Sequence, residues 1–447
     1  MKDSNFLFPL PEYNLKPNPS VINKAKPRLN SPQRNQIEFV NMCIDDLIPE
    51  DHQARSIWNY VKQMDLSLIT NKIQSTSATP GRPATDPQIL LSLWIYAMAE
   101  GIGSARVINK YCSEHLAFKW ICGGVAVNSH TISDFRKENA DEFDELVSMT
   151  IARLMEKDLI TLKRISQDGM RVRANAGSSS SRRRPKLKEL LIIAREQLKA
   201  LNDEIDADPS VCMNRQLAAK KRCAEDRKKR IEQALEENRK LIMEKNNAKR
   251  KQRKTLTEQE KKEVRTSTTD PTARKMKMAN GGFNQAYNVQ LAVDTKSRFI
   301  IGLSALNKNN DFGKLPEMFE QVKKRYSVKP KEWLVDQGYL VSTDVVKVQE
   351  QGCKVYMNPS DRGKRGAHMP REHEGAELTE WRVRMGTEEA KEIYKDRASN
   401  SEWANAGMRN RGLKQFLVRG LQAVKGVVCL HVLTHNILRA IILGYGW

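Results

Sequence analysis

Glu332-Trp-Leu-Val-Asp-Gln-Gly-Tyr339 is the most informative stretch of this 447-residue chain. Its apolar run, Trp333–Val335, predicts a short buried strand that ends at the acid Asp336. Gly338 follows two residues later and allows the backbone to turn sharply. In open α/β sheets, ligands bind at the carboxyl ends of strands such as this one. Taken alone, Asp336 is explained equally well as the cap of a following helix.

A second stretch of the same kind lies far upstream. Residues 161–169, Thr-Leu-Lys-Arg-Ile-Ser-Gln-Asp-Gly, also run from strand-like residues into the pair Asp168-Gly169. Between the two stretches, alternating apolar residues in 281–293 and 298–303 predict a β-hairpin, with Asp294 as a residue of its turn. Asp311 is interpreted as the N-cap of the helix that follows the hairpin.

The order of these elements indicates a fold class. A strand with Asp168, a hairpin, a helix, a strand with Asp336 and a long helix from near Glu388 follow one another, as in the ribonuclease-H-like nuclease fold. We therefore expect an α+β multidomain protein with a ribonuclease-H-like α/β catalytic domain over residues 158–447. Two divalent ions beside a scissile phosphate need hard oxygen ligands, and Mg²⁺ selects carboxylates.

The net charge favours a nucleic-acid partner. The chain has 76 Lys and Arg against 54 Asp and Glu, a formal charge of +22. An excess of this size exceeds what solubility alone requires and suits the release of counterions from bound phosphates.

Cysteines and hydropathy indicate a reduced, cytoplasmic setting. The seven cysteines contain no Cys-x-x-Cys pair, which argues against a zinc site and a disulfide framework. The N-terminus lacks the pattern of a signal peptide, and the apolar run 427–447 contains His431, His435 and Arg439, so we expect a core helix and no membrane partner. His431 and His435 are interpreted as a packed pair, not as metal ligands.

The N-terminal third predicts a helical DNA-binding domain over residues 36–157. A flexible arm over residues 1–35 precedes it. Asp86-Pro87 has the pattern of a helix start, and glycines separate several shorter helical segments. The last, 130–138, follows the expected cap Ser129 and brings polar and basic residues to a helix-turn-helix-like module. An ordinary helical bundle explains the pattern equally well. The candidate DNA contacts of this segment are His130, Arg136 and Lys137.

Residues 178–280 predict a basic helical hairpin inserted between the first and second strands. Apolar residues from Leu187 to Ile205 recur in steps of three and four, as in a coiled-coil seam, and Asp208-Pro209 ends the first helix. A second charged helix follows over about 212–251. Residues 181–280 hold 29 basic and 16 acidic side chains, which favours contact with phosphates over a merely solvated face.

Several motifs together resemble the DDE transposases of bacterial insertion sequences. The matching N-terminal segments are Pro83–Pro87, Gly101–Arg106 and His130–Arg136. The C-terminal match contains the family's Tyr, Arg, Glu and Lys signature, seen here as Tyr394, Arg397, Glu402 and Arg409. Two departures are present: four residues instead of three separate Arg397 from Glu402, and Arg409 replaces the usual Lys.

The resemblance implies an enzyme that cleaves the ends of its element and transfers the strands to target DNA. It implies that Asp168, Asp336 and Glu402 are the catalytic metal ligands for two Mg²⁺ ions, for which Mn²⁺ can substitute. The DNA-positioning residues that we expect near them are Arg171, Arg173, Tyr394, Arg397 and Arg409. The implied partners are terminal inverted repeats and target DNA, bound by a homodimer or a larger assembly in the bacterial nucleoid. The alternatives are a decayed copy that only binds DNA and a plain nuclease of the same fold.

Overall fold

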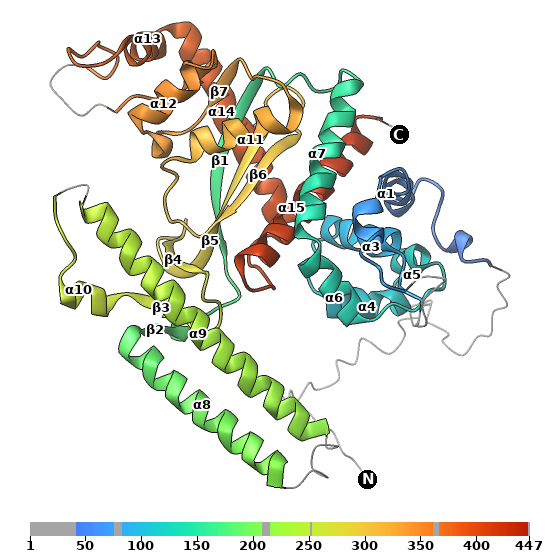
Figure 1. Ribbon diagram of the computed structural model, residues 1–447. Coiled ribbons are helices and arrows are strands. Elements are labelled where there is room, and N and C mark those ends of the chain that lie inside the picture. Colours follow the sequence, from blue (N-terminus) through green and yellow to red (C-terminus); the bar gives the residue numbers. More distant parts are fainter. Residues whose placement is uncertain (1–41, 76–82, 208–214, 251–252, 361–365, 446–447) are drawn as a thin grey trace, which may run out of the picture. The chain divides into compact units, whose positions relative to one another are not determined.

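The computed structural model describes residues 42–75, 83–207, 215–250, 253–360 and 366–445, so the arm expected at 1–35 lies outside the described residues (Figure 1). Residues 44–447 form one compact unit. Helices and a mixed six-stranded sheet build this unit, which confirms the α+β class.

The sheet places the two predicted Asp strands next to each other. Its strands are β1 (Arg164–Arg173), β4 (Arg274–Lys277), β5 (Phe283–Asp294), β6 (Ile300–Leu306), β7 (Glu332–Leu334) and β8 (Lys354–Tyr356). Their order is β4-β5-β1-β7-β8, and β6 also pairs with β5. β1 is antiparallel to β5 but parallel to β7, which is parallel to β8. β1 is therefore central: it pairs with β7 over Arg164–Ser166 and with β5 from Ile165 to Arg173.

The predicted hairpin is confirmed as β5 and β6. In its turn, Asp294 accepts hydrogen bonds from the Ser297 amide at 2.8 Å and the Ser297 hydroxyl at 2.6 Å. Burial raises the pKa of Asp294, and the bonds from Ser297 oppose that shift. This carboxylate thus stabilises the turn, as the sequence predicted.

The N-terminal part is helical. It contains α1 (Gln53–Lys62), α2 (Ser67–Thr70), α3 (Pro87–Ala99), α4 (Ala105–Glu114), α5 (Leu116–Cys122), α6 (Ser129–Glu138) and α7 (Ala140–Glu156). Asp86 caps α3 by accepting a hydrogen bond from the Gln88 amide at 2.8 Å, with Pro87 in the first turn, as predicted. The cap of α6 was predicted one residue too late: Asn128, not Ser129, accepts from the Thr131 amide.

The basic segment folds as the predicted helical hairpin. α8 (Arg184–Ala207) and α9 (Arg215–Arg250) pack along each other (Figure 1). Leu187 and Ala194 of α8 and Ala234 of α9 are buried. Three short elements accompany the hairpin and were not predicted: β2 (Ser181–Arg183), β3 (Arg265–Ser267) and α10 (Glu258–Glu263). β2 pairs with β3 in a separate two-stranded sheet. β4 belongs to the main sheet although it lies within 178–280.

Helices pack on both faces of the main sheet. They are α11 (Lys314–Tyr326), α12 (Ser342–Gln349), α13 (Ala376–Met385) and α14 (Glu388–Asn410). The edge contact between Phe319 and Trp333, with ring centroids 5.5 Å apart, packs α11 against β7. α14 contacts β1 and β5. Successive β1 residues point to opposite faces: Gln167 donates a hydrogen bond to the Lys314 carbonyl of α11, whereas Ser166 bonds to Ser401 of α14.

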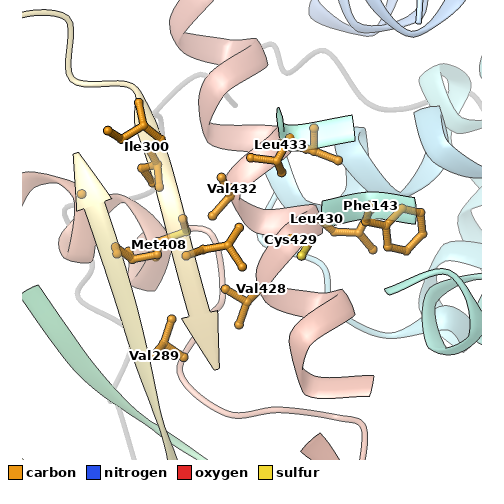
Figure 2. Close-up of a cluster of buried hydrophobic side chains, with 14 of the residues drawn as sticks. Phe143, Val289, Ile300, Met408, Val428, Cys429, Leu430, Val432 and Leu433 are labelled. Carbon is orange, nitrogen blue, oxygen red and sulfur yellow. The ribbon is translucent and has the colours of Figure 1, made fainter. Parts of the chain in front are cut away.

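The last helix, α15 (Leu421–Ile442), packs against α3, α7 and β6. Figure 2 shows Val428, Leu430 and Val432 of this helix among side chains that include Phe143 of α7 and Ile300 of β6. α15 is long and apolar enough to cross a membrane by length and composition, but 78% of its most apolar window is buried inside the protein. It is thus the core helix that the sequence predicted.

Candidate active site

Asp168 and Asp336 lie just beyond the point where the parallel pairing of β1 and β7 ends. Ser166 of β1 pairs with Leu334 of β7, and each acid lies two residues beyond its member of this pair. Asp336 has left the sheet there, whereas Asp168 lies within β1 and still pairs with Leu291 of β5. The structure therefore brings together the two aspartates that the sequence singled out.

Asp168 lies in a partly buried pocket. Its Oδ2 accepts a hydrogen bond of 2.9 Å from the Asn405 side chain of α14. Burial raises the pKa of Asp168 to about 6, with a further increase from the charge of Asp336, while the Gly169 amide and the Arg397 guanidinium oppose the shift. A carboxylate in such a setting gains from a cation placed beside it.

Asp336 combines two interpretations that were alternatives in the sequence. Its Oδ1 accepts a hydrogen bond of 2.8 Å from the Gly338 amide and caps the short 3-10 helix η5 (Gln337–Tyr339). This bond fixes the orientation of the carboxylate beside Asp168. Burial and the charges of Asp311, Asp168 and Asp336 raise the pKa of Tyr339 well above its usual range, so three acids surround this ring.

Asp311 is held behind the sheet by amide side chains. Its Oδ1 accepts from Asn288 at 2.7 Å and from Gln290 at 2.6 Å. The interpretation of Asp311 as an N-cap was wrong, because the residue before α11 is Gly313, which makes no side-chain cap. A Cβ at Gly169 would approach Asp311 Oδ1 to 2.9 Å and would collide with the Gln290 amide. Glycine at position 169 thus permits this packing directly behind Asp168.

α14 runs along β1 in step with it. The hydroxyls of Ser166 and Ser401 are 2.8 Å apart, and four helix residues farther on Asn405 meets Asp168. Four residues of helix and two of strand both advance about 6 Å, so the two elements stay level. Glu402 is exposed, and Arg409, seven residues later, is exposed as well.

Asp168 and Asp336 are of the ligand type that suits Mg²⁺, but the two residues alone are fewer than the three acids expected. Among the described residues, no group of three His, Cys, Asp or Glu side chains is close enough together to hold a metal ion. Asp168 and Asp336 offer the hard oxygen ligands that Mg²⁺ prefers. Glu402 is exposed on α14 and does not form such a group with Asp168 and Asp336.

The remaining signature residues of α14 lie close to Asp336. The Tyr394 hydroxyl donates to the Val335 carbonyl at 3.1 Å, one residue before Asp336. The Arg397 guanidinium lies 5.5 Å from the centre of the Tyr394 ring. Tyr394 thus holds the end of β7 in place, and Arg397 brings a positive charge near Asp168.

The other predicted DNA contacts are divided between surface and core. Arg171 and Arg173 are exposed on β1 beyond Asp168, and Arg171 donates to the Lys277 carbonyl at 2.6 Å. His130 and Lys137 are exposed on α6.

The prediction that Arg136 contacts DNA was wrong, because its side chain lies in the core. It is only 5% exposed, and its Nη1 donates to the Gly103 carbonyl at 2.7 Å. The guanidinium lies 4.3 Å from the Trp94 ring centre, and burial lowers the pKa of Arg136 to about 10. Arg136 therefore ties α6 to α3 instead of facing solvent.

The sequence did not single out Ser401 or Asn405 as residues of the site. Both are buried on the face of α14 that packs against β1. Their four-residue spacing places them on one side of the helix, and this spacing is the sequence signal that could have identified them.

Two family models match the chain, one over the N-terminal helices and one over a C-terminal segment that includes α14. A transposase domain (DUF772) matches residues 42–138 and a transposase DDE domain matches residues 339–441. The second match includes Glu402 and Asn405 but neither Asp168 nor Asp336. A comparison with curated proteins and with solved structures finds no match.

Proposed function

Because the chain belongs to the insertion-sequence DDE transposases, we propose that it cleaves the ends of its element and joins them to target DNA. The observation that carries this proposal is the placement of Asp168 and Asp336, each two residues beyond the last pair of the parallel ladder between β1 and β7. The order of elements supports a ribonuclease-H-like catalytic domain over 158–447: a strand with Asp168, a hairpin, a helix, a strand leading to Asp336 and a helix with Glu402.

Asp168, Asp336 and Glu402 are the residues that we propose as holders of two Mg²⁺ or Mn²⁺ ions. Such ions, when bound, activate water and then a 3′-hydroxyl and stabilise charge at phosphorus. Asp336 is already oriented by the Gly338 amide. Asp168 lies partly buried, and Glu402 completes the set from α14.

Basic residues supply the proposed contacts with DNA. Near the proposed metal ligands, the basic residues that we propose as DNA contacts are Arg171, Arg173, Arg397 and Arg409. Tyr394 supports this region through its hydrogen bond to the Val335 carbonyl after β7. In the helical segment 36–157, proposed as a helix-turn-helix-like DNA-binding domain, the proposed contacts are His130 and Lys137. The hairpin α8–α9, part of the insertion 178–280, carries a basic surplus that suits DNA phosphates. We place the reaction in the bacterial cytoplasm, on nucleoid DNA, with a dimer or larger assembly because two ends must meet.

The test is a nicking assay on a labelled duplex that carries the terminal repeats of the element. Wild-type protein with Mg²⁺ should nick the end and then give strand-transfer products with a target plasmid. Asp336→Asn and Glu402→Gln should abolish both reactions but keep binding of the ends. Glu392→Gln, which removes an exposed acid of the same helix that pairs with Lys395 at 2.5 Å, is the matched control and should react normally.

Three outcomes separate the alternatives. Nicking without joined products would identify a plain nuclease. Binding of the ends without nicking by the wild type would identify a protein that only occupies DNA. Full cleavage by Asp336→Asn would remove Asp336 from the site.

A further inference from the structure

We infer that Asn405 of α14 supplies an oxygen ligand to the metal ion that Asp168 holds. The inference rests on the proposed function and adds to the three acids a neutral ligand from the same helix as Glu402. It starts from the hydrogen bond between Asn405 of α14 and Asp168.

The spacing of the two side chains suits a shared ion. Asn405 Nδ2 and Asp168 Oδ2 are 2.9 Å apart. In an octahedral site with ligands at 2.0–2.1 Å, atoms bound side by side on one ion are separated by about 2.9 Å. The amide end of Asn405 therefore already occupies the position of a ligand that is adjacent to Asp168 Oδ2.

A half turn of the amide group converts a donor into a ligand without moving the backbone. A carboxamide carries an NH₂ donor at one end and an oxygen acceptor at the other, with nearly the same shape. The structure has the NH₂ group facing the carboxylate. A cation bound by Asp168 would instead favour the orientation in which the amide oxygen faces the ion.

Burial supplies an independent observation. Asn405 is 7% exposed, and its Oδ1 meets no hydrogen-bond donor within the described part of the chain. A buried carbonyl oxygen without a partner is unfavourable and requires an explanation. Coordination of a cation at Asp168 satisfies this oxygen, and amide oxygens are among the ligands that hard divalent cations accept.

The same helix offers a matched control in Asn400. Asn400 is 4% exposed, and its Oδ1 also lacks a donor among the described residues. Its Nδ2, however, donates to the Asp396 carbonyl of its own helix at 2.8 Å. Substitution of Asn400 thus changes a buried amide of α14 without removing the contact with Asp168.

The experiment measures Mn²⁺ binding to the full-length protein in the absence of DNA, by the electron paramagnetic resonance signal of free Mn²⁺. Asn405→Ala should weaken binding by about 10- to 100-fold, the range found when groups around a metal site are removed. Asn405→Asp should bind at least as tightly as the wild type, because a carboxylate oxygen replaces the amide oxygen. Asn400→Ala should bind like the wild type, and Asn400→Asp measures the effect of an added charge alone.

The variants distinguish a ligand from a hydrogen-bond donor. If Asn405 only donates to Asp168, Asn405→Asp loses the bond, sets two carboxylates against each other and binds Mn²⁺ no more tightly than Asn400→Asp. That result would overturn the inference, as would wild-type affinity in Asn405→Ala. If Asn405→Ala does not fold, the comparison of Asn405→Asp with Asn400→Asp decides.

Asp168→Ala separates this inference from the proposed function. Loss of Mn²⁺ binding in Asp168→Ala but not in Asn405→Ala would leave the metal site in place and remove Asn405 from it. Unchanged binding in Asp168→Ala would instead contradict the proposed metal site itself.

Discussion

The hydroxyl oxygens of Ser166 on β1 and Ser401 on α14 lie 2.8 Å apart, and both side chains are buried. This bond fixes the height of α14 along β1 and so determines which of its residues is level with Asp168. The residue that reaches Asp168 is Asn405, one turn beyond Ser401. A contact between two small polar side chains thus helps to set the position of α14 along β1.

Replacement of Ser401 by Ala should lower the free energy of unfolding by about 1 kcal/mol, the usual loss for one hydrogen bond. Ser166 would then keep its longer bond to the Arg397 carbonyl, at 3.3 Å. Urea denaturation measures the change. Ser399→Ala is the control, since Ser399 is exposed on the same helix, and its effect should stay below about 0.5 kcal/mol. Equal losses in both variants would show that the buried pair does not hold α14.

Gly169→Ala should destabilise the protein by about 1–3 kcal/mol, as overpacking of a filled interior does. The new methyl group would collide with the Gln290 amide and come within 2.9 Å of Asp311. Thermal unfolding measures the loss. Gly366→Ala is the control: a Cβ at Gly366 would have no described atom within 4 Å, so the melting temperature should stay nearly unchanged. An unchanged melting temperature in Gly169→Ala would mean that the side chains of Gln290 and Asp311 can move aside without loss of stability.

Asp168→Asn should stabilise the protein when a chelator removes metal ions. The folded-state pKa of Asp168 is about 6, above the ordinary value of 3.8, so its charge at pH 7 opposes folding. The neutral amide removes this cost, and the gain should be about 1–3 kcal/mol at pH 7. Lowering the pH through 6 should reduce the gain, because the wild-type carboxyl then becomes neutral too. A gain that does not depend on pH would assign the effect to something other than charge.

Acid should destabilise the protein through two buried histidines of α15. Burial lowers the pKa of His431 to about 3 and of His435 to about 4, against 6.5 for an unperturbed histidine. Both stay neutral in the folded protein, whereas in the unfolded chain they bind protons below pH 6.5. The free energy of unfolding therefore falls as the pH drops from 6.5 toward 4, by about 1.4 kcal/mol per pH unit for each histidine. His431→Leu should reduce the slope of unfolding free energy against pH by that amount. An unchanged slope would show that His431 protonates in the folded state.

The elements that carry strong local signals were predictable. The alternation in 281–303 gave the β5–β6 hairpin, Asp86-Pro87 gave the start of α3, and the three–four spacing gave the α8–α9 pair. In each case the pattern repeats over many residues or depends on backbone groups of the same turn. Such signals do not depend on distant parts of the chain.

The elements that depend on distant partners were not predictable. β2 and β3 are three residues each, and their pairing joins segments more than 80 residues apart. Arg136 carries the charge of a surface residue, yet the Trp94 ring and the Gly103 carbonyl accommodate it in the core. Asn405 belongs to the site only because α14 lies level with β1.

The path of α15 also has a consequence for how the protein is made. This helix packs on both α3 of the helical segment and β6 of the sheet, and it is encoded after every element that it covers. The faces of these elements that α15 covers therefore stay open until the ribosome has released Leu421–Ile442. We expect a polypeptide that stops before residue 421 to expose both apolar faces and to be prone to aggregation.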